Sequence, residues 1–445
     1  MPVFDPWRGA PGETEKLNHP DRGVRLEALR SLAPPRAKQG PPRPGEPEEV
    51  NNHIHTFYSF SPYSPSKAAW LAAAAGLASA GIMDHDSVSG AWEFIEAGRI
   101  LGLATTVGLE SRTDFSATPL RGRRLNNPDQ LSNAYIALHG IPHQHLEELN
   151  AYFAPLREER NKRNRLMTEG LNRLFQDLGG PAELRLDFQA DVVPLSRQAE
   201  GGSITERHLL YALAVKLIAA LGPGEGLVAF LEGKLGLCIR DTLKALLLDR
   251  ENPYYDYDLL GVLKSELVEA FYLEAEAECP EVRELLAFGQ RIGAVPAYSY
   301  LGDVRGSVTG DKKDQKFEDD YLEELFRVIV GLGFQAVTYV PTRNSLEQLE
   351  RVKRLCERYG LFQISGEDIN SPRQSFACPV LHRPEFRHLI DSTWALIGHE
   401  LAASRDPEAG MFSPRSLKEV AGLQERIRAF AELARSEHYR QGEGA

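Results

Sequence analysis

Cysteine is scarce in this chain, and long apolar runs are missing. The four cysteines lie far apart among 445 residues and form no Cys-x-x-Cys pair: they are Cys238, Cys279, Cys356 and Cys378. This spacing predicts reduced thiols that pack as small hydrophobic side chains in a cytoplasmic protein. No apolar run is long enough to cross a bilayer, and residues 1–6 lack a signal-peptide pattern, so we expect no membrane partner.

Positive charge is also in deficit. Lys and Arg number 51 against 63 Asp and Glu, which gives a formal net charge of −12. This balance argues against binding of polymeric nucleic acid over a broad surface. It leaves room for a small phosphorylated substrate, because a metal cluster supplies positive charge locally. A hydrophobic content of 42% is ordinary for a soluble globular protein, and the length suggests two or three domains.

What the chain does contain is a series of metal-ligand side chains, each directly after a short apolar stretch. His53 and His55 share one face of the first predicted strand, because side chains alternate along a strand. Asp84 and His85 end the second apolar stretch, and Glu110 ends the third. Two imidazoles on one face can share a cation, so this arrangement predicts a metal site.

Helix signals separate these stretches. Ser64 suits an N-cap and Pro65 suits the first helical position, and residues 90–97 predict a second helix. The order is strand, helix, strand, helix, strand, with each polar cluster at the carboxyl end of a strand. Parallel α/β folds place their active sites at that end, so we predict an α/β fold with its site there.

Three motifs carry a resemblance to a known family. The PHP (polymerase and histidinol phosphatase) superfamily has successive motifs that resemble His53-Ile54-His55-Thr56, Asp84-His85-Asp86-Ser87-Val88-Ser89-Gly90 and Gly108-Leu109-Glu110. The resemblance implies a distorted, TIM-like (β/α)7 PHP barrel with a metal cluster at its C-terminal mouth. It also implies phosphoester hydrolysis as the activity.

We expect five regions along the chain. Residues 1–49 form an N-terminal helical arm and a Pro- and Gly-rich linker, and residues 383–445 form two further helices. The barrel comprises residues 50–140 and 285–382. Residues 141–284 are a mostly helical insertion, which resembles the inserted domain of a PHP branch that hydrolyses phosphate from nucleotides and related small molecules. We expect it to cap the mouth, because ligand-bearing strand ends flank it on both sides.

The resemblance also implies the metal ligands. The first metal would be held by His53, His55, Glu110 and Asp368, all of which are present. Two histidines and two carboxylates suit Zn²⁺, Mn²⁺ or Fe²⁺. We therefore expect a divalent metal at this position.

The second metal position of the family is weakened here. Glu110 would act with a histidine on the fourth strand and with the histidine of an Ala-His-Pro motif, which is Tyr298 in this chain. Either Tyr135 takes the fourth-strand place and the ligand is lost, or His139 supplies it from further along. The two side chains share one face by period two, so the sequence leaves both alternatives open.

The third position of the family is weakened too. It would use His85, with Ser61 and Asn370 at places where the family has stronger ligands. Serine and asparagine are neutral and bind divalent metals weakly. We therefore expect fewer than three metals per chain.

Candidate substrate-binding residues follow the predicted strand ends and open one helix of the insertion. Arg112, Arg343 and Arg373 could clamp a phosphate through paired hydrogen bonds. Arg207 and His208 resemble a segment that lies close to the mouth in the family. A helix N-terminus with these side chains would suit a phosphate.

These features predict a metal-dependent phosphoesterase that hydrolyses a small phosphorylated molecule, such as a nucleotide or sugar phosphate, with a metal-activated water. The candidate catalytic residues are Asp84 and His85, and His85 could orient the nucleophile or protonate the leaving oxygen. The alternative is a catalytically degenerate PHP protein that binds a ligand or a partner without turnover. The losses at Ser61, Tyr298 and Asn370 favour this alternative, whereas the complete first site favours the enzyme.

Overall fold

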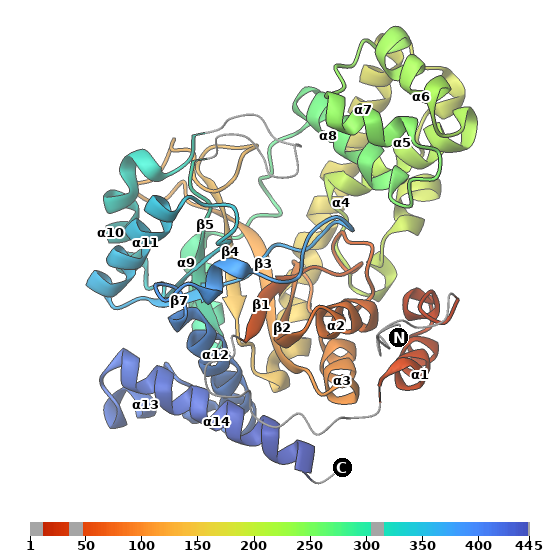
Figure 1. Cartoon of the computed structure of the whole chain (residues 1–445). Helices are drawn as coiled ribbons and strands as arrows, with labels where there is room; N and C mark the ends of the chain where they lie inside the picture. The colour runs from red at the N-terminus through yellow and green to blue at the C-terminus, as the bar shows by residue number, and fades with distance from the viewer. Residues whose placement is uncertain (1–11, 35–47, 304–315, 444–445) are drawn as a thin grey trace.

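A curled, seven-stranded sheet forms the centre of the computed structural model, which describes residues 12–34, 48–303 and 316–443 (Figure 1). The strands neighbour one another in chain order, from β1 to β7. Their bounds are β1 (Glu49–Ile54), β2 (Leu77–His85), β3 (Ala104–Asp114), β4 (Asn133–His139), β5 (Val295–Tyr300), β6 (Ala336–Tyr339) and β7 (Phe362–Ser365).

Six strands run in one direction and β4 runs against them. β4 pairs antiparallel with both β3 and β5, whereas the other neighbouring pairs are parallel. The described connection between β3 and β4 contains no α-helix that would return the chain to the start of a parallel strand. The regular (β/α)7 order that we expected is therefore interrupted at β4. We call the end of the sheet where the six parallel strands finish the carboxyl edge, and the opposite end, where they begin, the amino edge.

The sheet curls until its first and last strands meet, as in a barrel. Ile54 forms a parallel bridge with Ile369, just beyond β7. The Ile369 N–H donates to the His53 carbonyl at 3.0 Å, and the His55 N–H donates to the Ile369 carbonyl at 2.9 Å. The Asn52 amide also donates to the Ser365 carbonyl at 2.8 Å. These bonds bring the segment after β7 directly beside the histidines of β1.

Helices follow the strands and surround the sheet. Before the insertion they are α1 (Arg22–Leu32), α2 (Pro65–Ala74) and α3 (Ala91–Leu101). After it they are α9 (Val282–Arg291), α10 (Leu322–Leu332), α11 (Leu346–Tyr359), α12 (His388–Arg405), α13 (Pro414–Glu419) and α14 (Leu423–Glu443). Ser64 caps α2 as expected, since its side chain accepts the Lys67 N–H. The C-terminal region has three α-helices where we expected two, and α12 packs against the amino edge through β1 and β3.

The long segment between β4 and β5 is helical. It contains α4 (Leu146–Asp177), α5 (Glu206–Leu221), α6 (Glu225–Ala229), α7 (Asp241–Leu248) and α8 (Tyr255–Phe271). Figure 1 shows α5 to α8 gathered at one side of the molecule, away from α12 and α14. The first half of α4 packs into the core around the sheet through Leu149 and Phe153. Its second half packs into a separate core with α5 to α8 through Met167 and Leu171.

The chain before β1 contributes one α-helix to the described structure. The N-terminal helix α1 is fastened by a buried ion pair, in which Arg25 Nε donates to Glu93 Oε1 of α3 at 2.8 Å. The linker expected before β1 falls on residues 35–47 and lies outside the described residues. No single described helix has both the length and the apolar character to cross a membrane, although one bent pair, Glu206–Leu221 with Glu225–Lys234, meets the two criteria jointly.

Candidate functional site

The carboxyl edge brings together His53 of β1, His55 directly after β1, and one carboxylate from beyond β7. His53 Nε2 lies 3.1 Å from His55 Nε2, and His55 Nε2 lies 3.2 Å from Asp368 Oδ1. His53, His55 and Asp368 thus form a group whose ligand atoms all lie within 4.8 Å of one another. The bridge between Ile54 and Ile369 explains why residues far apart in the sequence converge here.

A second group forms around the ends of β2 and β3. These strands pair in parallel register, which places His85 beside Glu110. His85 Nδ1 lies 3.4 Å from Glu110 Oε2, and the same oxygen lies 3.7 Å from His53 Nε2. His55, His85 and Glu110 meet the same 4.8 Å criterion. His55 belongs to both groups, and one nitrogen lone pair can bind only one ion at a time. The two groups are therefore alternative positions for a single ion.

The donor set fits a divalent transition metal. Imidazole nitrogens and carboxylate oxygens are ordinary ligands for Zn²⁺, Mn²⁺ or Fe²⁺. His85 Nδ1 is buried and has no hydrogen-bond partner among the described residues, which leaves its lone pair directed at the cluster. Burial, followed by the neighbouring His55 ring, holds the pKa of His85 well below its ordinary value. A neutral imidazole of this kind is a lone-pair donor, as a metal ligand must be.

Asp368 is held in its charged form. Desolvation alone would raise the pKa of this carboxyl group, but its close contacts with the His55 and His53 rings hold it well below its ordinary value. Asn370, at the place of a family histidine, donates from Nδ2 to Asp368 Oδ1 at 2.7 Å. Asn370 therefore contacts the candidate ligand Asp368 through its side-chain amide.

Asp84 lies behind the cluster, away from the cavity. It is buried, and its Oδ1 accepts the Thr56 N–H and the Ser59 hydroxyl, both at 2.7 Å. Its Oδ2 accepts the Thr56 hydroxyl at 2.6 Å. Burial raises the pKa of Asp84, although these donors oppose the shift. Of the two candidate catalytic residues, only His85 lines the cavity.

The direction of β4 separates the two alternatives for its ligand. Tyr135 pairs with Arg112 near the carboxyl edge, lines the cavity and lies 5.5 Å from His85 between ring centroids. His139 pairs with Val295 at the start of β5, toward the amino edge. It is buried, and it belongs to neither ligand group of the described residues. Because β4 is antiparallel, its last residue lies farthest from the cavity.

Tyr298 and Ser61, at two further positions where the family has metal ligands, are both buried away from the cavity. Tyr298 is fully buried and packs edge-on against Phe115 and Phe334 in the core around the sheet. Ser61 is buried, and its hydroxyl has no hydrogen-bond partner among the described residues. Neither residue is among the described residues that line the cavity.

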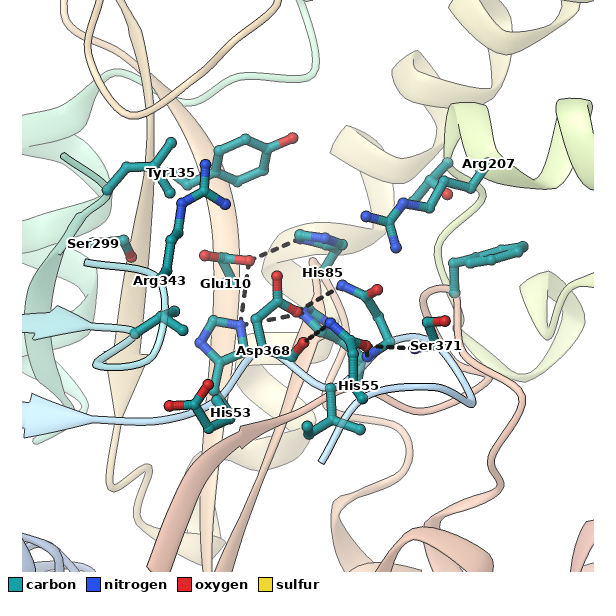
Figure 2. Close-up of a pocket in the computed structure, with 18 of the residues that line it drawn as sticks. His53, His55, His85, Glu110, Tyr135, Arg207, Ser299, Arg343, Asp368 and Ser371 are labelled. Atoms are coloured by element: carbon teal, nitrogen blue, oxygen red, sulfur yellow. Dashed lines mark hydrogen bonds and ion pairs between the residues drawn. The ribbon is translucent and has the colours of Figure 1, made fainter. Parts of the chain in front are cut away.

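The cavity has a volume of about 790 Å³ and lies between the carboxyl edge and the insertion. The sheet side contributes the ligand cluster. The insertion contributes polar and apolar side chains, among them Arg207, Leu243, Tyr257, Leu260 and Lys264. Figure 2 shows Arg207 approaching the cluster from the insertion, with Arg343 on the other side of the cluster.

The candidate substrate-binding arginines differ in their partners. Arg112 donates from Nε to the Tyr135 hydroxyl at 2.6 Å and pairs with Glu206 at 3.4 Å, but its buried Nη1 has no hydrogen-bond partner among the described residues. Arg207 forms no ion pair with any described residue. Arg373 is already engaged with Asp258 of α8 through two hydrogen bonds of 2.7 Å. All four arginines line the cavity, and Arg112 and Arg207 are the better candidates for an anion.

His208 takes a structural role. Its Nδ1 accepts the Thr205 N–H at 3.0 Å in a capping box at the start of α5, and its ring packs edge-on against Phe60. Burial lowers the pKa of His208 to about 3, so it is neutral. It is not among the described residues that line the cavity, and it cannot contact an anion there.

The sequence interpretation missed several residues that hold the site together. Glu206 pairs with Arg112, Asp258 pairs with Arg373, and Arg160 of α4 pairs with Asp86 at 2.7 Å. Each pair joins the insertion to the sheet side. No local pattern announces these pairs, because their members are separated by more than seventy residues.

Comparisons with known proteins give two distant structural likenesses. No protein-family model matches the chain, and no curated protein matches it. A solved structure from Bifidobacterium adolescentis, described as a metal-dependent phosphoesterase, is 18% identical and has a TM-score of 0.49, with 80% of this chain and 98% of that chain covered. An amidohydrolase from Chromobacterium violaceum with bound sulfate and no metal is 17% identical and has a TM-score of 0.47, with coverage of 77% and 96%. Both likenesses are too distant to carry an argument about activity.

Proposed function

We propose that this chain is a metal-dependent phosphoesterase of the PHP type that acts on a small phosphorylated molecule. The observation that carries the proposal is the convergence of three histidines and two carboxylates at one end of a cavity that arginines also line. The holders of the metal would be His53, His55, His85, Glu110 and Asp368. When bound, a divalent cation supplies Lewis acidity, which lowers the pKa of coordinated water toward about 7 and polarises phosphoryl oxygens.

Side chains around the cluster offer contacts for the phosphate group of a substrate. Nη1 of Arg112, which has no hydrogen-bond partner in the described part of the chain, and the guanidinium of Arg207 offer hydrogen bonds to phosphoryl oxygens. His85 Nδ1 is buried, has no hydrogen-bond partner among the described residues and faces Glu110 at 3.4 Å, a placement that suits a metal ligand or a proton acceptor. This geometry supports His85 as a ligand or a base rather than as the acid that protonates the leaving oxygen.

The cavity restricts the size of the substrate. A volume of about 790 Å³ suits one small molecule, and the helices of the insertion form the wall opposite the cluster. A nucleotide or sugar phosphate would fit, whereas a polymer would have to displace the insertion. The Arg373–Asp258 pair, which joins the loop after β7 to α8, opposes that displacement.

Phosphate release from a panel of small phosphomonoesters, with Mn²⁺ or Zn²⁺ added to the purified protein, tests this proposal. We expect turnover that depends on added metal and that falls on the order of 100-fold in His85→Ala. His19→Ala, at an exposed position that does not line the cavity, is the matched control and should keep wild-type activity. Metal and ligand binding without release from any substrate would instead support a binding protein.

A further inference from the structure

A chain of buried hydrogen bonds runs from Asp84 to His55. Ser59 Oγ donates to Asp84 Oδ1 at 2.7 Å and lies 3.2 Å from His55 Nδ1. All three residues are at most 1% exposed, so water does not compete for these bonds. His55 is also the residue common to both ligand groups.

The direction of this chain follows from counting hydrogens. An ionised carboxylate only accepts, and Asp84 accepts from Ser59 and twice from Thr56. Because the single hydroxyl hydrogen of Ser59 points to Asp84, Ser59 Oγ can only accept from His55. The His55 proton then lies on Nδ1, and the lone pair lies on Nε2, which faces His53 and Asp368.

We propose that Asp84 and Ser59 are positioning residues that fix the Nδ1–H tautomer and the ring orientation of His55, so that Nε2 is ready for a divalent metal. This inference rests on the proposed metal site. Ligating histidines commonly donate their other ring nitrogen to a carboxylate, a carbonyl or a water, and here a serine hydroxyl stands between the histidine and the carboxylate. Asp84 thereby acts on the site without contacting substrate or metal.

Two variants distinguish the effect of hydrogen-bond direction from the effect of the Asp84 charge. In Asp84→Asn, the amide oxygen can take the place of Oδ1 and still accept from Thr56 and Ser59, while the amide nitrogen donates to the Thr56 hydroxyl. The direction of the chain survives although the charge is lost. In Ser59→Ala, the carboxylate stays but the His55 Nδ1–H loses its acceptor.

The test measures Zn²⁺ affinity by chelator competition in the purified, folded chain. We expect Ser59→Ala to bind at least about 10-fold more weakly than wild type, and Asp84→Asn to stay within about threefold. The matched control is Ser79→Ala in β2, where a serine hydroxyl is equally buried and has no hydrogen-bond partner among the described residues. It should bind as wild type does.

A spectroscopic measurement excludes a merely structural effect. In ¹⁵N-histidine-labelled, Zn²⁺-loaded protein, we expect one slowly exchanging imidazole Nδ1–H signal from His55 that is lost in Ser59→Ala and kept in Asp84→Asn. The proposal is overturned if Ser59→Ala keeps wild-type affinity, or if Asp84→Asn loses as much affinity as Ser59→Ala. A wild-type protein that binds no metal would overturn the proposed function and this inference together, whereas tight wild-type binding with an unaffected Ser59→Ala overturns the inference alone.

Discussion

Buried histidines lie at both edges of the curled sheet, but their hydrogen bonds differ. At the amino edge, His399 Nε2 donates to the Gly293 carbonyl and its Nδ1 accepts the Met411 N–H, both at 2.9 Å. At the carboxyl edge, His53 and His55 face each other through Nε2, and the buried His85 Nδ1 has no hydrogen-bond partner among the described residues.

This difference separates a structural histidine from a candidate ligand. The ring of His399 has both nitrogens satisfied by backbone groups, so a metal would have to break existing bonds. The histidines at the carboxyl edge direct ring nitrogens at carboxylates and at one another, an arrangement that a bound cation would stabilise. His139 belongs to neither kind. Its Nε2 is buried without a hydrogen-bond partner in the described part of the chain, and His139 is in neither ligand group found there.

The largest effect should come from comparing two alanine variants, each of which removes one histidine from one edge. His55→Ala removes the residue shared by both ligand groups, so we expect it to abolish metal binding at concentrations that saturate the wild type while the metal-free protein stays folded. His399→Ala should do the reverse and lower the free energy of unfolding without changing metal affinity. Metal analysis and thermal unfolding of both variants measure the contrast, and equal metal loss in both would contradict it.

The second effect is a pH dependence that originates at the amino edge. Burial lowers the pKa of His399 to about 4 from an ordinary value of 6.5. A depressed pKa means that the unfolded chain takes up the proton first, so stability from this residue is complete above pH 6.5 and is lost as the pH falls toward 4. The loss reaches about 3 kcal/mol. Denaturant unfolding between pH 7 and 4 should show a smaller loss in His399→Gln, while His19→Gln should follow the wild type.

The third effect is stabilisation by metal at the carboxyl edge. Free metal at 100 times its dissociation constant should raise the free energy of unfolding by about 2.7 kcal/mol, because the metal binds the folded site. Unfolding with and without added Zn²⁺, after treatment with a chelator, measures the shift. We expect no shift in His55→Ala, and a full shift in that variant would place the metal elsewhere.

The smallest effect should come from Asn370→Ala. This change removes the amide that donates to Asp368 Oδ1 but leaves every ligand in place. We expect metal affinity to fall severalfold, about 1 kcal/mol, since one hydrogen bond to a charged group is lost. Chelator competition measures it, with Ser371→Ala as a neighbouring control. An unchanged affinity would show that Asp368 is positioned by its backbone alone.

The sequence predicted local features well. The period of two predicted that His53 and His55 share a face, and the structure brings both into one ligand group although β1 ends at Ile54. The capping residues located the start of α2. Residues 90–97 were predicted as part of a helix, and the structure has α3 over Ala91–Leu101. These predictions depend on neighbours in the chain, where side-chain period and capping chemistry are sufficient.

Long-range features were beyond the reach of the sequence. The reversed direction of β4 decides that Tyr135 rather than His139 faces the cavity, and it depends on how residues 115–132 turn the chain back between the neighbouring strands β3 and β4. The partner of Arg373 is Asp258, which lies 115 residues away on α8. Chain entropy and packing determine such contacts, and no spacing in the sequence encodes them.

The division of α4 between two cores has a consequence for how the chain folds. This helix has 32 residues, so it extends about 48 Å and enters both hydrophobic cores. Its first half buries Phe153 with the sheet, and its second half buries Leu171 with α5 to α8. Unfolding either core would strip apolar contacts from a helix that the other core needs, so the two should melt in a single cooperative transition. The insertion is therefore a poor candidate for excision as an independently folding unit.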